Sequence, residues 1–523
     1  MLAVPILAVV SSLTFPKGEV WLHLWRTQLF ELVGSTFLLV IGVGAGTLVV
    51  GTGLAWLVVH YRFPGRSVLE WALILPLAVP AYVMGFVFLG LFEYSGPVQT
   101  GLRRSLGEGV RLPELRSYWG VVLMMTLVFY PYVYLLARTA FRDQSGAAIE
   151  TARSLGWSRA QTFLHVTLPM ARPSLVAGVA LAMMEAMADF GTVATFGYRT
   201  LTEAVYRVWY GMFDRIAATQ LASVLLLFAL ALILLERRSR GRARFTQTGR
   251  RGPALAPSEL RGWGAAAATA SCLATLTLAF LLPVGQLAWW AAAALRDGQI
   301  APAFGALLTR TCVLAAVAAL LACLLAVLLA YAGRLHGTPT VRFVVQFASM
   351  GYALPGAVIA VGVLLPLAWV DHTVAPLLER GLGHPIGLLF TGSAAGLVLA
   401  YLVRFLAVSL QTVEASLGKI SPSLDDAARS LGARAGAALR RVHLPLIRGG
   451  LMTAVILVFV ETMKEMPATL LLRPFGFNTL AVEIWERTSE AMWQEASVPA
   501  LTLVGVGLLP VIVLVRLSLG SSR

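Results

Sequence analysis

The chain has 523 residues, of which 58% are hydrophobic and 13% are charged, and its mean hydropathy is +0.78. This composition excludes a disordered chain and an ordinary water-soluble globular protein. The net charge of +15 would indicate nucleic-acid binding in a soluble protein. In a membrane protein it is explained by basic loops on the cytoplasmic side. We therefore expect an integral membrane protein that binds no nucleic acid and contacts the lipid bilayer.

Apolar runs long enough to cross a bilayer as a helix, which needs about 20 residues, occur eleven times. In chain order they are Leu32–His60, Ser67–Leu91, Trp119–Ala137, Pro173–Phe196, Ile216–Leu235, Gly264–Leu295, Thr311–Ala332, Val341–Val370, Ile386–Val403, Gly450–Leu472 and Val498–Val515. Met1–Phe15 is a twelfth candidate. It lacks the basic segment of a signal peptide, so we expect a short anchor or a partial span there. The sequence predicts an all-α polytopic membrane protein with about twelve spans.

Basic residues concentrate in alternate connections, which indicates that these connections face the cytoplasm. They are Arg138, Arg142, Arg153, Arg159 and Arg172 in one connection, Arg237, Arg238, Arg240, Arg242, Arg244, Arg250, Arg251 and Arg261 in the next, and Arg404, Lys419, Arg429, Arg434, Arg440, Arg441 and Arg448 in a third. Residues 237–262 are also rich in glycine and proline, which predicts a solvated cytoplasmic linker; RNA binding there is the alternative. The cysteines Cys272, Cys312 and Cys323 lie in apolar runs, so buried thiols are expected.

The chain contains an internal repeat. A shift of 276 residues superposes Glu150 on Asp426, the run 153–156 on 429–432, and the pair 168–169 on 444–445. Pro80 meets Pro355 at a shift of 275. A repeat of this kind implies two similar halves about a pseudo-twofold axis. We expect two parallel six-helix repeats, residues 1–236 and 263–523, joined by the linker 237–262.

The repeated segments 150–169 and 426–445 are called here the first and second elbows. Their shared positions are Glu150, Ala152, Gly156, Leu168 and Pro169 in the first elbow, and Asp426, Ala428, Gly432, Leu444 and Pro445 in the second. Alanine-rich stretches on both sides of a glycine predict two short helices with a sharp bend, and the proline is expected to help end the second helix. Such an elbow could pass a push from a soluble partner to the membrane helices. The alternative is an ordinary helical connector.

This pattern resembles the EAA loop of the transmembrane subunits of ABC importers that work with a periplasmic binding protein. The resemblance implies that a homodimer of ATPase subunits grips the two elbows, with ATP and magnesium bound by that partner. The sequence contains no G-x-x-x-x-G-K-[ST] motif of its own, and no catalytic centre can be identified, so a transport subunit rather than an enzyme is expected. The family leads one to expect Glu where the second elbow has Asp426, whose shorter reach would weaken a salt bridge.

Further stretches resemble the fused iron(III) importer permeases. They are residues 130–138, 188–193, 460–469, 472–477 and 479–481. The resemblance implies ferric iron as the cargo, delivered by a periplasmic binding protein to a permease in the bacterial cytoplasmic (inner) membrane. No directly bound cofactor is implied. An ABC permease for thiamine, sulfate or a phosphonate remains an alternative, and so does a secondary active transporter.

Acidic residues recur at related positions in two predicted spans. Glu185 and Asp189, like Glu461 and Glu465, are four residues apart, so each pair is expected on one face of its helix. Four carboxylates suit a hard, highly charged cation, which predicts transient metal contact along a translocation path. Lys464 could neutralise part of this charge. The alternative is that these groups pair with one another and hold a gate closed.

Three tyrosines alternate near the end of a predicted span, at Tyr130, Tyr132 and Tyr134. Phenolate oxygens could serve an iron path. An interfacial aromatic belt, in which the rings sit at the level of the lipid headgroups, is the interpretation that we favour.

Overall fold

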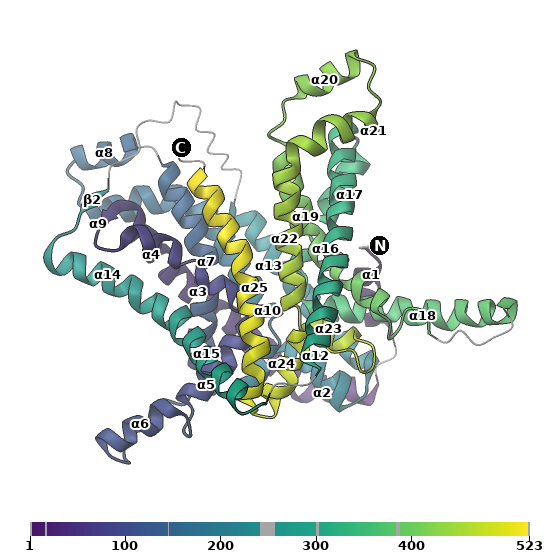
Figure 1. Cartoon of the computed structure of the whole chain (residues 1–523), viewed down its shortest axis with the longest axis horizontal. Helices are drawn as coiled ribbons and strands as arrows, with labels where there is room; N and C mark the ends of the chain where they lie inside the picture. The colour runs from purple at the N-terminus through teal and green to yellow at the C-terminus, as the bar shows by residue number, and fades with distance from the viewer. Residues whose placement is uncertain are drawn as a thin grey trace. The chain divides into compact units, whose positions relative to one another are not determined.

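The computed structural model describes residues 3–15, 18–144, 146–240, 257–299, 303–382 and 388–520, and these are almost entirely helical (Figure 1). Within them, eleven helices are long and apolar enough to cross a membrane. The pair Ala3–Thr14 and Glu19–Thr27, which is bent by 87°, would make a twelfth span. The predicted all-α polytopic fold is confirmed.

The first half of the chain contains thirteen α-helices within the described residues. They are α1 Ala3–Ser11, α2 Glu19–Thr27, α3 Leu29–His60, α4 Arg66–Ala72, α5 Ala81–Phe92, α6 Pro97–Leu106, α7 Tyr118–Asp143, α8 Gly146–Ser154, α9 Arg159–Thr162, α10 Leu168–Ala188, α11 Gly191–Thr195, α12 Leu201–Tyr206 and α13 Arg215–Arg240. Short 3-10 helices cover Ser12–Thr14 and Leu75–Ala78, and π-turns cover Phe163–Thr167 and Arg207–Gly211. Most of the predicted linker, residues 241–256, lies outside the described residues.

The second half contains twelve described α-helices. They are α14 Gly262–Leu276, α15 Leu282–Arg296, α16 Phe304–Leu335, α17 Pro339–Ala348, α18 Gly356–Leu382, α19 Ala394–Leu417, α20 Pro422–Ser430, α21 Ala435–Ala438, α22 Leu444–Lys464, α23 Pro467–Leu472, α24 Leu480–Ser489 and α25 Trp493–Gly520. A 3-10 helix covers Gly351–Ala353, and π-turns cover Thr277–Leu281 and Leu439–His443. The two short strands β1 Tyr61–Arg62 and β2 Ser258–Glu259 pair in parallel.

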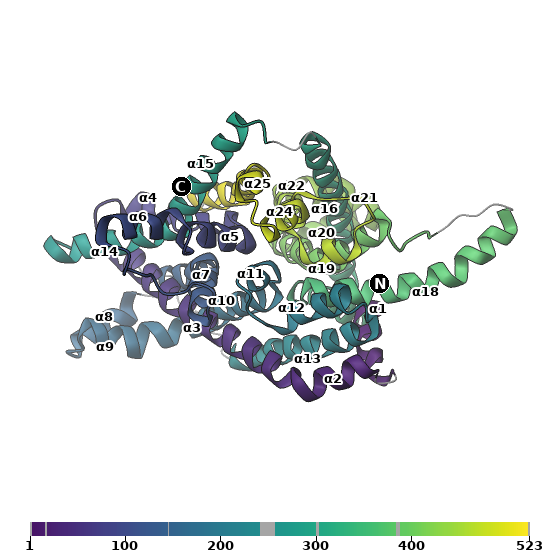
Figure 2. The same ribbon diagram turned by 90° about the horizontal axis from the view of Figure 1, so that it is seen from below.

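The helices form two compact units, each built on three packed helices. Unit 1 comprises residues 1–26, 204–226 and 297–523, and unit 2 comprises residues 27–203 and 227–296. In unit 2, α3, α7 and α10 pack on one another; in unit 1, α16, α19 and α22 do the same, and Figure 2 shows them side by side. These triplets are equivalent in the repeat, so the packing follows the duplicated sequence.

The compact units do not coincide with the predicted halves, because segments are exchanged between them. The N-terminal helix α1 belongs to unit 1, where it packs on α18, and the backbone oxygen of Pro5 lies close to Gly362. The equivalent part of the second half, α14 and α15, belongs to unit 2, where α15 packs on α5. Each unit is therefore completed by the leading segment of the other half. The domain boundaries 1–236, 237–262 and 263–523 stay a prediction about the repeats.

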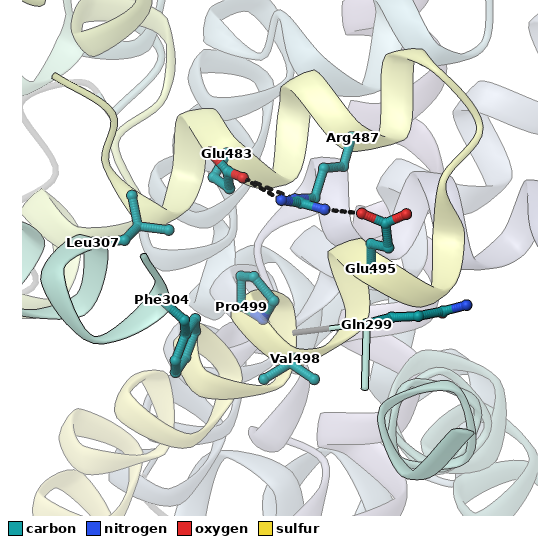
Figure 3. A pocket seen from close by; sticks show the side chains of 8 residues that line it. All are labelled: Gln299, Phe304, Leu307, Glu483, Arg487, Glu495, Val498 and Pro499. Atoms are coloured by element: carbon teal, nitrogen blue, oxygen red, sulfur yellow. Dashed lines mark hydrogen bonds and ion pairs between the residues drawn. The ribbon is translucent and has the colours of Figure 1, made fainter. Parts of the chain in front are cut away.

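A second feature shared by the two halves is a threonine that fixes the start of a later helix. In unit 2, the backbone N–H of Leu201 donates a hydrogen bond of 3.0 Å to Thr36 Oγ1. In unit 1, the N–H of Leu480 donates one of 2.9 Å to Thr311 Oγ1. Both threonines are buried, so these bonds satisfy helix N-termini that water does not reach. Unit 1 adds an ion pair between Arg487 of α24 and Glu495 of α25 (Figure 3).

Two predicted spans are interrupted in the same way. Ser67–Leu91 divides into α4, a 3-10 turn and α5, and Val341–Val370 divides into α17, a 3-10 turn and α18. The breaks fall just before Pro80 and Pro355, where the preceding residues are extended, with ψ of 119° at Val79 and 131° at Leu354. A residue before proline is sterically excluded from helical conformation. Each predicted apolar run therefore contains a short helix and the separate span that follows it, which hydropathy alone could not distinguish.

The assignment of Arg138 and Arg404 to cytoplasmic connections was wrong. Arg138 lies in α7 and Arg404 lies in α19, and both side chains are buried. Each guanidinium is paired with a buried carboxylate of its own unit, Arg138 with Glu70 and Arg404 with Glu465. Pairing offsets the desolvation cost that keeps isolated charges out of a protein or membrane interior.

The cysteine prediction is confirmed for Cys272 and Cys323, which are buried free thiols, whereas Cys312 is half-buried.

Candidate coupling site

Both elbows have the predicted shape, with two short helices joined at a glycine. Gly156 and Gly432 adopt positive φ angles of 85° and 77°. After the glycine the chain closes back onto the preceding helix: the N–H of Trp157 donates to the Ala152 carbonyl at 3.1 Å, and the N–H of Ala433 donates to the Ala428 carbonyl at 3.0 Å. This is the bond of a Schellman turn, which ends a helix with one residue in the left-handed region. The duplicated sequence therefore specifies a duplicated geometry.

The prediction that Pro169 and Pro445 help end the second helix was wrong. The helix instead runs on into the span, as one apolar helix over Arg159–Ala188 and over Ala435–Lys464. A π-turn directly precedes each Leu-Pro pair, and in it the N–H of Leu168 donates to Phe163 and that of Leu444 to Leu439. The wider turn accommodates a proline ring that would clash with the carbonyl four residues earlier. Each elbow is thus continuous with a membrane helix.

The elbows present the same kinds of side chain to solvent. Glu150 and Asp426 are exposed, whereas Ala152 and Ala428 are buried. The leucine before each glycine is also exposed, by 72% at Leu155 and by 87% at Leu431. A preformed turn that exposes both an acidic side chain and a leucine is suited to seating in the groove of a soluble partner.

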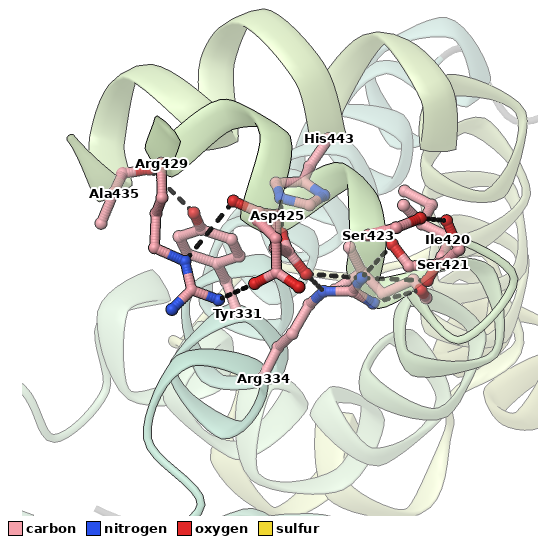
Figure 4. A network of polar contacts seen from close by, with 11 residues as sticks. Tyr331, Arg334, Ile420, Ser421, Ser423, Asp425, Arg429, Ala435 and His443 are labelled. Carbon is pink, nitrogen blue, oxygen red and sulfur yellow. Dashed lines mark hydrogen bonds and ion pairs between the residues drawn. The ribbon is translucent and has the colours of Figure 1, made fainter. Parts of the chain in front are cut away.

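An ionic network around Asp425, which directly precedes the second elbow in α20, holds the elbow to the end of α16 (Figure 4). The Arg334 guanidinium lies 2.7 Å from the Asp425 carboxylate and donates further bonds to the carbonyls of Leu417 and Ile420. On the other side of Asp425, His443 Nε2 lies 2.7 Å away. The Tyr331 hydroxyl donates to the Ala435 carbonyl at 2.8 Å. These contacts tie both helices of the elbow to a long helix of unit 1.

Aromatic contacts occupy the equivalent place in the first elbow. At the shift of 275 that also relates Thr36 to Thr311, Trp56 of α3 is equivalent to Tyr331. The Trp56 ring centroid is 4.4 Å from that of Phe163 and 5.8 Å from that of Phe141. Ile149, which is buried, stands where the repeat has Asp425. The two elbows share a backbone shape but are anchored by different chemistry. The periodic sequence pattern did not reveal either anchor, because the anchoring side chains come from helices distant in the chain.

The acidic pairs do not lie on single helix faces as predicted. Helix α10 ends at Ala188 and α22 ends at Lys464, so Asp189 and Glu465 follow in extended conformation. Each carboxylate instead accepts a hydrogen bond from the start of the next short helix: Asp189 from the N–H of Thr192 at 2.7 Å, and Glu465 from the N–H of Ala468 at 2.9 Å. Glu185 and Glu461 remain in the helices and are half-buried.

Glu465 also takes part in a buried polar cluster of unit 1. The Arg404 guanidinium lies 3.2 Å from its carboxylate, and the Tyr401 hydroxyl is 2.6 Å from Thr469 Oγ1. Tyr206 donates to the Pro467 carbonyl. Burial raises the pKa of Tyr206 well above its usual value, so its hydroxyl stays protonated. Arg404 is 61 residues away from Glu465 in the chain, so no local sequence pattern could reveal it as the partner.

The four predicted metal ligands are divided between the two units, with Glu185 and Asp189 in unit 2 and Glu461 and Glu465 in unit 1, where Lys464 also lies. Over the described ranges, the structure contains no group of three or more histidine, cysteine, aspartate or glutamate side chains placed to hold a metal ion. Transient metal contact by Glu185, Asp189, Glu461 and Glu465 stays a prediction.

The tyrosine prediction was wrong for two of its three residues. Tyr130 and Tyr134 are completely buried in unit 2, and their hydroxyls each donate a hydrogen bond of 2.8 Å, to the carbonyls of Leu73 and Glu70. A belt residue must reach the membrane interface, and these rings instead fasten α7 to the segment around α4. Tyr132 is half-buried.

Comparison with known proteins gives consistent matches. The model of the family described as "binding-protein-dependent transport system inner membrane component" matches residues 47–238 and again residues 322–520. The chain is 26% identical to an Fe(3+)-transport system permease protein of Haemophilus influenzae, over 94% of this chain and 90% of that protein. It is 29% identical to a sulfate transport system permease protein of Escherichia coli, over 45% of this chain and 84% of that protein. A probable molybdenum ABC transporter permease of Haloferax volcanii is 35% identical, over 35% of this chain and 66% of that protein.

Proposed function

Because the chain belongs to the family of inner-membrane components of binding-protein-dependent transport systems, we propose that it is the membrane permease of an ATP-driven importer for ferric iron. The family match covers both halves, so the chain is a fused permease with two repeats, and it is a multi-pass inner-membrane protein. Membership also excludes the alternative of a secondary active transporter. The family implies partners of two kinds, an ATPase and a binding protein.

In this proposal each elbow seats on one subunit of an ATPase homodimer, which binds ATP and magnesium. The observation that carries the proposal is the matched turn at Gly156 and Gly432, each continuous with a membrane helix. Two identical ATPase subunits require two similar docking shapes, which the repeat supplies. A rigid elbow that runs into α10 or α22 passes a displacement to the span without bending. Closure of the ATPase dimer would then shift the helices between outward-open and inward-open states.

The cargo proposal is supported by similarity along the whole chain. The Fe(3+) permease of Haemophilus influenzae matches 94% of this chain, whereas the sulfate permease of Escherichia coli matches 45% of it. Carboxylate oxygens suit a hard trivalent cation, and Glu185, Asp189 and Glu461 are the proposed path residues, whereas the Glu465 carboxylate is paired with Arg404. Sulfate is the second candidate, favoured by the similarity to sulfate permeases.

Crosslinking tests whether both elbows seat on the ATPase. A photocrosslinking amino acid is placed at position 150 or at position 426 in the assembled transporter. We expect both positions to capture the same ATPase polypeptide, because a homodimer offers one subunit to each elbow. Capture at neither position would overturn the docking proposal. Position 108, an exposed glutamate that follows α6 and lies outside both elbows, serves as a control for non-specific capture.

A further inference from the structure

The loop between α23 and α24 carries a fully exposed phenylalanine at its tip. Residues Pro474 to Phe477 form a tight turn, in which the N–H of Phe477 donates to the Pro474 carbonyl at 3.0 Å. Gly476 has a φ of 71°, which this turn requires. Phe475 is fully exposed: its solvent-accessible surface is 108% of the reference value for an exposed phenylalanine. This is the highest value among the exposed large hydrophobic residues of the described ranges. The tight turn therefore presents the Phe475 ring to the outside of unit 1.

Polar contacts fix the base of this loop, which we call the tip loop, residues 473–478. Arg473 pairs with Glu486 of α24 at 2.7 Å and donates to Asn478 Oδ1. The Asn478 amide in turn donates to Glu486 at 2.7 Å and to Glu483 at 3.0 Å. These bonds close the loop onto the first turns of α24.

Further polar contacts fix the tip of this loop and the C-terminal part of α24. Arg310 of α16 donates to the Gly476 carbonyl at 3.3 Å. The network continues along α24, where Arg487 lies 2.8 Å from Glu483 and pairs with Glu495, as Figure 3 shows. The tip loop is therefore preorganised, and little conformational entropy is lost when a partner covers Phe475.

The first repeat lacks this feature, although it contains the same short sequence. Phe-Gly followed by an aromatic residue occurs at 196–198 and at 475–477, and a threonine and a leucine follow two residues later in both. Three more residues precede the phenylalanine in the second repeat, relative to the shift of 276. Phe196 is 2% exposed, whereas Phe475 is completely exposed. The longer loop of the second repeat thus lifts its phenylalanine out of the fold.

The tip loop lies at the end of unit 1 that is opposite to the second elbow. Helix α22 starts at the elbow and ends at Lys464, and the chain reaches the tip loop directly afterwards through α23. Figure 1 shows α20 and α24 at opposite ends of α22. With the elbow in the cytoplasm, the tip loop faces the outside, where cargo is delivered.

We propose that the tip loop is a docking point for the soluble binding protein that delivers cargo, with Phe475 as the apolar anchor and Arg473 and Glu486 as its charged rim. An exposed aromatic residue within a polar rim is the usual form of an energetic hot spot at protein interfaces. The difference between the repeats supports this partner. A single binding protein has no twofold symmetry, so its orientation on a duplicated permease has to be set by features that only one repeat carries.

This inference rests on the proposed function, and its test separates the two. The probe is the iron-loaded binding protein that stimulates ATP hydrolysis by the wild-type transporter in nanodiscs. If no binding protein stimulates the wild type, the proposed function fails before the tip loop is tested. In Phe475→Ala we expect the concentration for half-maximal stimulation to rise by about tenfold to thirtyfold, while hydrolysis without binding protein stays unchanged. Trp263→Ala is the matched control, because it removes an aromatic residue that is 92% exposed at the start of α14. It should change the half-maximal concentration of binding protein by less than about twofold.

A crosslinking arm distinguishes a protein partner from the membrane surface. The photocrosslinking amino acid p-benzoylphenylalanine replaces Phe475 in the same nanodiscs. We expect an adduct with the binding protein that disappears when excess unlabelled binding protein competes. An adduct with lipid alone, no adduct of either kind, or an unchanged half-maximal concentration in Phe475→Ala would overturn the proposal.

Discussion

The salt bridge of 2.7 Å between Arg334 and Asp425 joins the end of a long membrane helix to the first helix of the second elbow. Both side chains are mostly buried, with exposed fractions of 17% and 16%. In the proposed coupling, force received by the elbow would reach α16 through this pair and α22 through the chain. The first elbow reaches its own long helix through the ring of Trp56.

Asp425→Asn should weaken the attachment of the second elbow to α16 without changing the backbone conformation of the elbow. Hydrogen bonds to charged groups contribute about 1.5–3 kcal/mol, so backbone amides of residues 422–438 should exchange with deuterium about tenfold faster or more. Hydrogen–deuterium exchange with mass spectrometry measures this directly. Asp426→Asn is the matched control, since its partner Arg429 and Asp426 itself are each 72% exposed, and such pairs contribute little. Equal acceleration in both variants would contradict the anchoring role.

Substitution of the elbow glycines should impair coupling in proportion to backbone strain. No heavy atom lies within 4 Å of a Cβ built on Gly156 or Gly432, so only the positive φ resists a side chain. Alanine should cost about 1–2 kcal/mol there. Proline, fixed at a φ of about −65°, should uncouple ATP hydrolysis from uptake while the protein still inserts.

The ratio of cargo transported to ATP hydrolysed measures this effect in proteoliposomes. Gly436→Ala in α21 is the control, because it is an open helical position where alanine is preferred to glycine. Normal ratios in both proline variants would argue against rigid elbows.

The pair of Arg404 and Glu465 should behave as a unit. Side-chain exposures of 9% and 4% mean that either charge alone would be buried without compensation. Arg404→Met should therefore destabilise unit 1 by about 3–5 kcal/mol, and adding Glu465→Gln should restore most of that loss. Thermal stability of the detergent-purified single and double variants checks this. Losses that simply add would show that the two groups do not interact.

Local sequence signals predicted the features that depend on neighbouring residues. The apolar runs fixed the number of long helices, and the Gly156 and Gly432 turns followed from a glycine after an alanine-rich helix. The wrong expectations about Pro169 and Pro445 have a local cause too: a π-turn relieves the proline clash, and its presence has no simple sequence signature.

The features that escaped sequence reasoning depend on residues far apart in the chain. Arg138 and Arg404 were predicted to lie in loops because a hydropathy scale gives arginine the same value whether it is solvated or buried in an ion pair. The prediction that Glu465 lies on a helix face required α22 to continue past Lys464. The helix ends there, and the Glu465 carboxylate instead accepts a hydrogen bond from the N–H of Ala468 at the start of the next helix. Burial of Tyr130 depends on the position of Leu73, 57 residues away. Long-range packing decides each of these cases.

The most direct test of the account is uptake of radioactive ferric iron into proteoliposomes that contain the permease, with its ATPase inside and its iron-loaded binding protein outside. We predict uptake that requires ATP, the ATPase and the binding protein together, and that excess sulfate or molybdate does not inhibit. Iron uptake by the permease alone would contradict the claim that the two elbows receive their work from a separate ATPase.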